Sequence, residues 1–158
     1  MTATLNDTRS VRRINLNRVA PEFYEGMMTL SAAAEKGIDR TLAELIKIRA
    51  SQLNHCAFCL DMHSADARKQ GETEQRIYLL SAWEEAGDLY TQQEQAALAL
   101  TEEMTDLTRG GHVSDAVYAR AAAAFTDAEL GQVIAMATVI NAWNRISVST
   151  RVRPPHRH

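Results

Sequence analysis

Proline occurs at only three positions of this 158-residue chain, all near its ends: Pro21, Pro154 and Pro155. A proline inside a helix removes a backbone hydrogen bond and clashes with the preceding turn, so the proline-free interval leaves helices unbroken. That interval is rich in alanine, leucine and glutamate, which favour helices, and it contains no Asn-Gly hairpin signal. The sequence therefore predicts an all-α fold.

Glycines mark the expected helix ends, and capping boxes mark some of the expected starts. The boxes are TQQE from Thr91 to Glu94 and TDAE from Thr126 to Glu129. These signals predict a single compact helical domain of about six to seven helices, over residues 22–36, 40–55, 57–70, 73–86, 91–107, 114–125 and 127–147. We expect residues 1–15 to form a flexible N-terminal arm, residues 16–150 the domain and residues 151–158 a C-terminal tail.

The apolar positions also predict which side chains are buried. Helical spacing in 40–55 predicts an inward face, formed by Leu42, Leu45, Ile46, Arg49 and Leu53. Trp83 and Trp143 lie among alanines and leucines, and we expect them to pack in the core or at a subunit interface.

Charge and hydropathy argue against two classes of partner. Lysine and arginine number 17 against 20 acidic residues, and a net charge of −3 predicts no nucleic-acid partner. Arg9, Arg12 and Arg13 cluster in the expected arm, where we expect them to be solvated. No segment approaches the roughly 20 consecutive apolar residues that span a bilayer, and the N-terminus lacks the apolar core of a secretory signal. We therefore expect a cytoplasmic protein without membrane partners.

The stretch HCAFCLDMH, from His55 to His63, holds both cysteines of the chain. In a helix from Cys56, Cys59 lies about 60° and His63 about 20° from Cys56 around the axis. Helical neighbours three and four residues apart have Cβ atoms about 5–6 Å apart, so two thiols and an imidazole can meet. His55 points about 100° away from Cys56, which favours a surface or supporting position.

Three kinds of site fit this spacing. A structural disulfide would close a four-residue loop, worth about 1.9 kcal/mol against about 3 kcal/mol for fifteen residues. Zinc could bind Cys56, Cys59 and His63, with His55 or a carboxylate as the fourth ligand, but no second ligand pair exists. Redox catalysis is favoured, because Cys-x-x-Cys motifs, helix N-termini and nearby histidines lower thiol pKa values. Such a site needs a proton carrier, worth about 10²–10⁴ in rate, and His63 is in place to be one.

Residues 44–68, ELIKIRASQLNHCAFCLDMHSADAR, resemble the alkylhydroperoxidase D-like (AhpD-like) branch of the carboxymuconolactone decarboxylase superfamily. That branch is characterised by a glutamate, then Cys-x-x-Cys, then a histidine four residues beyond the second cysteine. Glu44 precedes Cys56 by twelve residues, and His63 completes the pattern. Residues 140–155, INAWNRISVSTRVRPP, are similar to the usual ending of compact members.

This resemblance implies an AhpD-like all-helical fold that assembles into a homo-oligomer, a trimer or hexamer. It also implies a thiol peroxidase without a cofactor or metal, acting on organic hydroperoxides or hydrogen peroxide. Cys59 would attack the peroxide, and Cys56 would resolve the sulfenic acid to a redox-active Cys56–Cys59 disulfide. His63 and Glu44 would form the proton relay, and an external thiol or dithiol would reduce the disulfide.

Two positions depart from the family pattern. Some members carry a histidine just before the second cysteine, where this chain has Phe58, so that histidine's help with proton delivery is missing. His55 stands where a small residue, commonly glycine, is expected, and it could compensate for that loss or crowd the entrance.

Other interpretations of single residues remain open. Glu44 could end a capping box, TLAE, that begins at Thr41, and His63 could be a core histidine without a chemical role. We expect no function for the remaining histidines, His112, His156 and His158.

Two alternative functions remain. One is a protein disulfide reductase or adaptor with little peroxide activity. The other is a redox-sensing, oligomeric binding protein without turnover. Decarboxylation is not expected, because members with that activity lack the cysteine motif.

Overall fold

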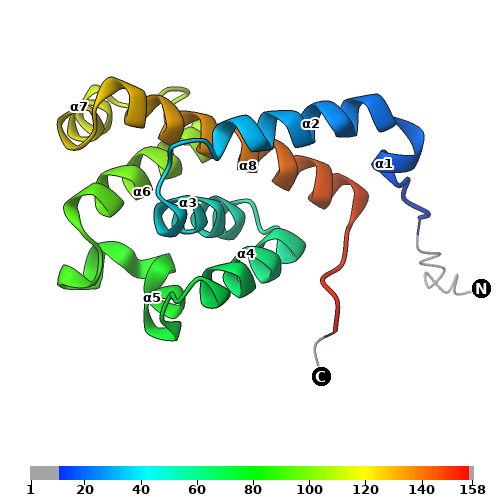
Figure 1. Cartoon of the computed structure of the whole chain (residues 1–158), viewed down its shortest axis with the longest axis horizontal. Helices are drawn as coiled ribbons and strands as arrows, with labels where there is room; N and C mark the ends of the chain where they lie inside the picture. Colours follow the sequence, from blue (N-terminus) through cyan, green and yellow to red (C-terminus); the bar gives the residue numbers. More distant parts are fainter. Residues whose placement is uncertain (1–10, 157–158) are drawn as a thin grey trace, which may run out of the picture.

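The computed structural model describes residues 11–156, and every regular element among them is a helix (Figure 1). Eight α-helices lie in this range: α1 (Leu16–Val19), α2 (Pro21–Ala34), α3 (Arg40–Leu53), α4 (Ala57–Lys69), α5 (Glu74–Leu79), α6 (Gln92–Thr105), α7 (Asp115–Ala124) and α8 (Asp127–Thr150). The same range holds three 3-10 helices: η1 (Leu80–Glu85), η2 (Gly87–Leu89) and η3 (Leu107–Arg109). The predicted all-α single domain is confirmed.

The two predicted capping boxes begin α6 and α8. The Thr91 hydroxyl accepts a hydrogen bond from the Glu94 backbone, the Glu94 carboxylate accepts one from the Thr91 backbone, and Thr126 and Glu129 pair in the same way. α8 continues past the predicted end at residue 147 and stops where Arg151 adopts a left-handed conformation with φ 52°. The starts of these helices were thus encoded locally, because a capping box needs only neighbouring residues.

The helix predicted over residues 73–86 is interrupted. α5 ends at Leu79, and the chain continues as η1, within which Ala82 leaves the helical region with φ −129° and ψ 34°. Leu80 and Trp83 are thereby both buried, at 0% and 3% exposed, and the Trp83 indole donates to Glu102 at 2.7 Å. Tertiary burial overrides the local helical preference here. The short α1, in a stretch where the sequence predicts no helix, is a second difference.

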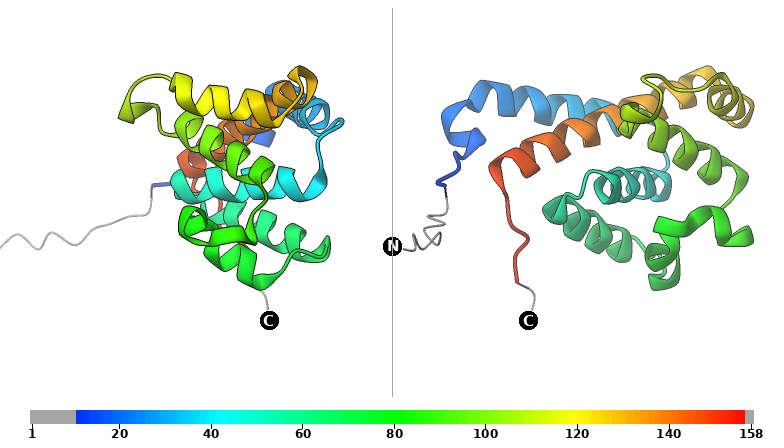
Figure 2. Two further views of the ribbon diagram at one scale, coloured as in Figure 1. Left: turned by 90° about the vertical axis from the view of Figure 1, so that its left-hand side faces the viewer. Right: turned by 180° about the vertical axis from the view of Figure 1, so that it is seen from behind.

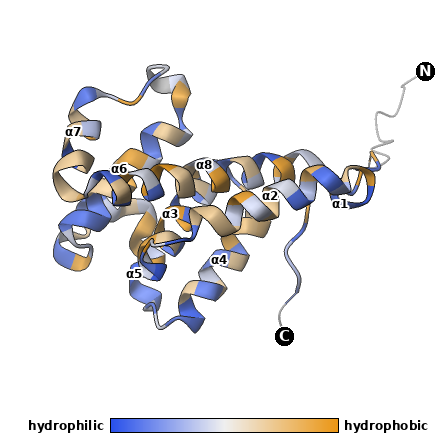
Figure 3. Ribbon diagram, turned by 45° about the horizontal axis from the view of Figure 1, so that its top comes forward, coloured by the Kyte–Doolittle hydropathy of each residue, from blue (hydrophilic) through white to orange (hydrophobic). Residues whose placement is uncertain are grey.

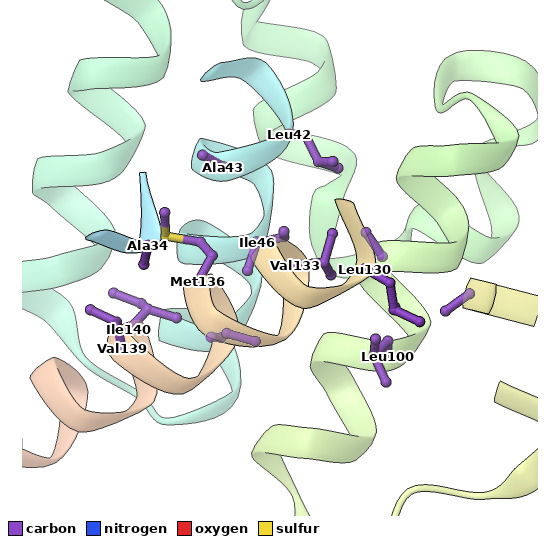
Figure 4. Packing of buried hydrophobic residues seen from close by; sticks show 14 of the residues in the cluster. Ala34, Leu42, Ala43, Ile46, Leu100, Leu130, Val133, Met136, Val139 and Ile140 are labelled. Carbon is purple, nitrogen blue, oxygen red and sulfur yellow. The ribbon is translucent and has the colours of Figure 1, made fainter. Parts of the chain in front are cut away.

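The central helix is α3, which packs against α4, α6 and α8 (Figures 1 and 2). Figure 4 shows hydrophobic side chains of α3, such as Ile46, meeting Val133 and Met136 of α8. The predicted inward face holds in part: Leu42, Leu45 and Ile46 are buried, whereas Arg49 and Leu53 are half-buried. Glu44 and Lys47 are buried as well, so α3 carries two charged side chains into the interior.

α2 lies alongside α8, and this pair extends beyond the other helices toward the end of the molecule where both chain termini lie (Figures 1 and 2). Trp143 of α8 packs edge-to-face on Tyr24 of α2 with 5.1 Å between ring centroids, and its indole donates to Ser31 Oγ at 2.8 Å. Figure 3 shows hydrophobic residues along α8. Trp83 and Trp143 therefore have the packing positions that were predicted.

Some sequence predictions fall outside what the structure describes. Arg9 and His158 lie outside residues 11–156, whereas Arg12 and Arg13 are exposed before α1. The Arg13 guanidinium donates to the backbone carbonyl of Ser149 at 3.3 Å, which brings this segment onto α8. The proposed limits of arm, domain and tail stay a prediction. No helix in the described range combines the length and apolar character needed to cross a membrane.

Candidate active site

The turn between α3 and α4 places both cysteines. Cys56 is the N-cap of α4, and its sulfur accepts a hydrogen bond from the Cys59 backbone N–H at 3.4 Å. Both cysteines are free thiols and only 2% exposed. The preceding residue, His55, is exposed and adopts φ 52°, a left-handed conformation that glycine adopts without strain. The backbone thus gives a physical reason for the small residue expected at this position.

The first thiol lies where a negative charge is stabilised. The hydrogen bond from the Cys59 side chain is the main cause that lowers the pKa of Cys56 to about 6, against the opposing effect of burial. The same hydrogen bond holds the proton on Cys59 and, together with burial, raises the pKa of Cys59. The partial positive charge at the N-terminus of α4 favours a thiolate on Cys56 as well. The reduced pair therefore shares one proton, with the negative charge on Cys56.

Polar groups of α8 lie against the two sulfurs. Ser147 Oγ lies 3.6 Å from Cys59 Sγ, and hydrogen bonds from Asn144 and Ser147 lower the pKa of both cysteines. Asn144 is fully buried, donates to Ser51 Oγ at 3.0 Å and accepts from Asn54 at 2.9 Å. This network fixes the polar edge of α8 against the turn that carries Cys56.

A line of charged groups leads from His63 across α3. His63 Nδ1 lies 3.0 Å from Glu44 Oε2, Glu44 Oε1 accepts from Lys47 Nζ at 3.0 Å, and Lys47 Nζ also donates to Glu35 at 3.0 Å. Burial alone would raise the pKa of Glu44, but the hydrogen bond to His63 and the charge of Lys47 more than offset this, and the net pKa is lowered. Glu44 is therefore a buried carboxylate in its ionised form.

A cavity of about 690 Å³ opens between α2, α4, α8 and the segment before α2. Cys59 and His63 lie on its wall, near the charged Lys47 and Glu35. The rest of the wall is mainly apolar, with Tyr24, Met28, Phe58, Met136, Ile140 and Trp143 among its residues. Cys56 does not belong to this wall. The thiol that holds the charge and the thiol that meets the cavity are thus two different residues.

The four predicted site residues form two contacting pairs, Cys56 with Cys59 and Glu44 with His63, and the cavity wall holds one member of each pair, Cys59 and His63. Cys56, Cys59 and His63 come from the start of α4, and Glu44 comes from α3 beside them. The capping-box interpretation of Glu44 is wrong, because Asp39 is the N-cap of α3 and accepts from the Leu42 backbone. The chemical roles of the four residues stay predictions.

The other histidines lie apart from this cluster or outside the described residues. His112 is exposed and bonds the Gly110 carbonyl, and His156 is exposed near the chain end. Across residues 11–156, no three His, Cys, Asp or Glu side chains are arranged to hold a metal ion. One nitrogen of His63 is instead engaged by Glu44.

The sequence interpretation missed four contributors: Glu35, Lys47, Asn144 and Ser147. A signal existed for Lys47, which is three residues from Glu44 on one helix and so must be its neighbour. Asn144 and Ser147 are likewise three residues apart on α8, so they lie on one face of that helix. Glu35, the C-cap of α2, meets Lys47 of α3 through a tertiary contact for which the sequence offered no local signal.

Comparisons with known proteins point in one direction. The sequence model described as "Carboxymuconolactone decarboxylase family" matches residues 21–103. Uncharacterized protein YdfG of Bacillus subtilis (strain 168) is 45% identical over 139 residues, covering 87% of this chain and 93% of that protein.

Solved structures match as well. A protein of unknown function from Agrobacterium tumefaciens, a candidate antioxidant defence protein AhpD, has a TM-score of 0.87 and 36% identity, over 92% of this chain and 99% of that chain. An alkylhydroperoxidase AhpD core from Ralstonia eutropha JMP134, an uncharacterized peroxidase-related protein, has a TM-score of 0.75 over 89% of this chain and 74% of that chain. At 18% identity, that second likeness concerns the fold alone.

Proposed function

The chain belongs to the carboxymuconolactone decarboxylase family, and from this premise we propose that it is an AhpD-like thiol peroxidase that reduces organic hydroperoxides or hydrogen peroxide. One observation carries the proposal: Cys59 and His63 share the wall of one cavity, with Cys56 in hydrogen-bond contact with Cys59. Thiol, resolving thiol and proton carrier are the three groups that a dithiol peroxidase needs.

The first step forms a sulfenic acid. The proton between the two sulfurs moves from Cys59 to Cys56, and the Cys59 thiolate attacks the terminal oxygen of the hydroperoxide. The S–O bond forms while the O–O bond breaks, and the alkoxide that leaves takes a proton held by His63. Phe58 adds to the apolar wall where some family members have a histidine, so proton delivery in this chain falls to His63.

The second step closes the disulfide. The Cys56 sulfur attacks the Cys59 sulfenic acid, the S–S bond forms, and the hydroxyl group leaves with the Cys56 proton as water. An external thiol or dithiol then reduces the Cys56–Cys59 disulfide and returns two protons to the site. Each cycle thus converts one hydroperoxide and two reducing thiols into an alcohol, a water and a disulfide.

The shape of the cavity supports an organic hydroperoxide as the preferred substrate. A volume of about 690 Å³ with a mainly apolar wall accommodates an apolar body far larger than hydrogen peroxide. Burial of that apolar body adds binding free energy of roughly 25 cal/mol per Å², which hydrogen peroxide cannot gain.

The test measures turnover of cumene hydroperoxide with dithiothreitol. We expect Cys59→Ser to abolish turnover and His63→Gln to lower kcat/KM by about 10²–10⁴-fold. His112→Gln, which changes an exposed histidine far from the cysteines, is the matched control and should keep the parent rate. Parent-like turnover by Cys59→Ser would overturn the assignment of the attacking thiol.

A disulfide reductase is the second candidate, and the thiolate on Cys56 favours it. The first cysteine of a Cys-x-x-Cys motif at a helix N-terminus is a good nucleophile toward disulfides. Against it, both sulfurs are 2% exposed, and the apolar cavity leads to Cys59 rather than Cys56. A mixed disulfide trapped in Cys59→Ser, together with negligible peroxide turnover by the parent, would favour this candidate.

We also propose that the protein works as a homo-oligomer, a trimer or hexamer. Large apolar side chains are exposed along α2, including Phe23 at 54% and Leu30 at 47%. Exposed apolar residues that cluster on one helix are typical of protein–protein contacts. Burial against a second copy would remove this surface from water.

A further inference from the structure

Lys47 is a buried cation between two carboxylates. Its side chain is 10% exposed, and its ammonium group lies 3.0 Å from Glu44 and 3.0 Å from Glu35. Glu44 comes from the same helix, whereas Glu35 comes from the end of α2 and is 56% exposed at its side chain. The ammonium therefore joins the buried carboxylate of the site to a carboxylate that reaches solvent.

These charges also separate two hollows. On one side lies the apolar cavity of about 690 Å³ with Cys59 and His63. On the other lies a polar pocket of about 330 Å³, where Arg40 and Gln70 join Glu35, Glu44 and Lys47. Lys47 and Glu35 belong to both walls.

The charge of Lys47, together with the hydrogen bond from His63, keeps Glu44 ionised despite its burial. A buried carboxylate without a cation takes up a proton more readily, because burial disfavours the charged form. Burial alone would lower the pKa of Lys47. The charge of Glu44 and the hydrogen bond to Glu35 outweigh this effect, so the net pKa of Lys47 is raised and both partners keep their charges. The groups that face this pair are Glu35 from α2, Arg40 from α3 and His63 from α4.

The protonation of Glu44 in turn decides whether His63 Nδ1 carries the proton that faces Glu44. An ionised carboxylate is only an acceptor, so His63 Nδ1, at 3.0 Å, must donate to it. With Nδ1 as the donor, Nε2 is the nitrogen that takes up a proton and gives it to the leaving alkoxide. A protonated Glu44 could instead donate to Nδ1, and the neutral carboxyl group would no longer stabilise the doubly protonated imidazole that gives a proton to the alkoxide.

The geometry points to Lys47, supported by Glu35, as a positioning residue that keeps Glu44 a carboxylate and thereby sets the tautomer and orientation of His63 in the cavity. This inference rests on the proposed peroxidase function for its effect on rate. Its structural part, the hold of Lys47 on Glu44, stands independently of that function.

The experiment compares Lys47→Met, which keeps length and removes charge, with Lys47→Arg, which keeps the charge. We expect Lys47→Met to lower kcat/KM for cumene hydroperoxide by about 10- to 100-fold near neutral pH, as loss of a supporting partner typically does. The acid limb of the pH profile should move to higher pH, and the Glu44 carboxyl titration, followed by carbon NMR, should move the same way. Lys47→Arg should largely restore both readouts.

Arg49→Met is the matched control, because it breaks another partly buried ion pair of α3, with Glu102 at 2.7 Å. It should lower stability without moving either pH readout. Should Lys47→Met fail to fold, Lys47→Gln removes the same charge but keeps a hydrogen-bond donor beside Glu44 and Glu35, and it should shift both readouts in the same direction as Lys47→Met.

The inference is overturned if the Glu44 titration and the pH profile stay at their parent positions in the folded variants. A different result would sink the peroxidase proposal alone: no hydroperoxide turnover by the parent, while the Glu44 titration still moves in Lys47→Met. That outcome would support the hold of Lys47 on Glu44.

Discussion

At the scale of single residues, the two cysteines lie in different environments. Cys56 caps α4 and holds the negative charge, whereas Cys59 lies on the cavity wall. Because the two thiols share one hydrogen bond, moving its proton transfers the charge to the cavity side. In the proposed mechanism, the Cys56 thiolate, with its lowered pKa, takes the proton of Cys59, whose own pKa is raised.

This division predicts an early thiolate titration in the reduced protein. With the pKa of Cys56 at about 6, thiolate absorbance in the ultraviolet should rise through about pH 6. Cys56→Ser should remove this step, and Cys59→Ala should move it to higher pH because the stabilising side-chain hydrogen bond is lost. A first step near the ordinary value of 9.0 in the parent would contradict the assignment.

The same shift has a consequence for stability with a definite sign. Between about pH 6 and 9.0, the unfolded chain keeps the Cys56 proton that the folded chain has released. The free energy of unfolding of the reduced protein, relative to Cys56→Ser, should therefore rise with pH in this window. This stabilisation should be lost as the pH falls through about 6, and urea denaturation at several pH values measures it.

At the scale of elements, the α3–α4 turn is the feature that sets the site. Its sharp reversal needs a left-handed residue, and His55 supplies it at φ 52°. A residue with a Cβ atom in this conformation costs roughly 1–2 kcal/mol relative to glycine. The turn therefore carries strain at the position directly before Cys56.

This strain predicts opposite effects for glycine at two places. His55→Gly should be more stable than His55→Ala by about 1 kcal/mol, because only glycine relieves the left-handed strain. The control is Ala122→Gly on the exposed face of α7, which should lose about 1 kcal/mol as glycine does in a helix. Denaturant unfolding measures both, and equal stability of the two His55 variants would contradict the strain argument.

At the scale of the whole molecule, the α2–α8 pair has two sides with different surroundings. Its inner side closes the cavity with residues such as Trp143, and its outer side exposes Phe23 and Leu30. An assembly that buries the outer side would also restrain the helices that line the cavity. In the proposed homo-oligomer, assembly and cavity shape would therefore be coupled through the same two helices.

We therefore predict that the assembly depends on the outer side of α2. The parent should elute as a homo-oligomer in size-exclusion chromatography with light scattering, and the double variant Phe23→Asp, Leu30→Asp should shift it toward the monomer. Tyr78→Asp, at a residue that is 70% exposed on α5, is the control and should keep the parent mass. A monomeric parent would refute the predicted assembly.

The sequence by itself determined the starts of the helices that have capping boxes, α6 and α8. It also placed Cys56, Cys59 and His63 within the first two turns of one helix. Capping boxes and helical spacing involve residues within a turn or two of each other, so the chain encodes them without tertiary contacts. The family pattern added Glu44, whose contact with His63 joins two helices.

Only the tertiary structure decided what surrounds these residues. The cavity, the meeting of Glu35 with Lys47, and the contact of Ser147 with Cys59 each require helices far apart in the chain to pack together. Packing also broke the helix predicted over residues 73–86 at Ala82, because the burial of Trp83 outweighed its local preference. The burial and the charged neighbours of each residue depend on which helices pack together, and helix packing is a property of the whole fold rather than of local sequence.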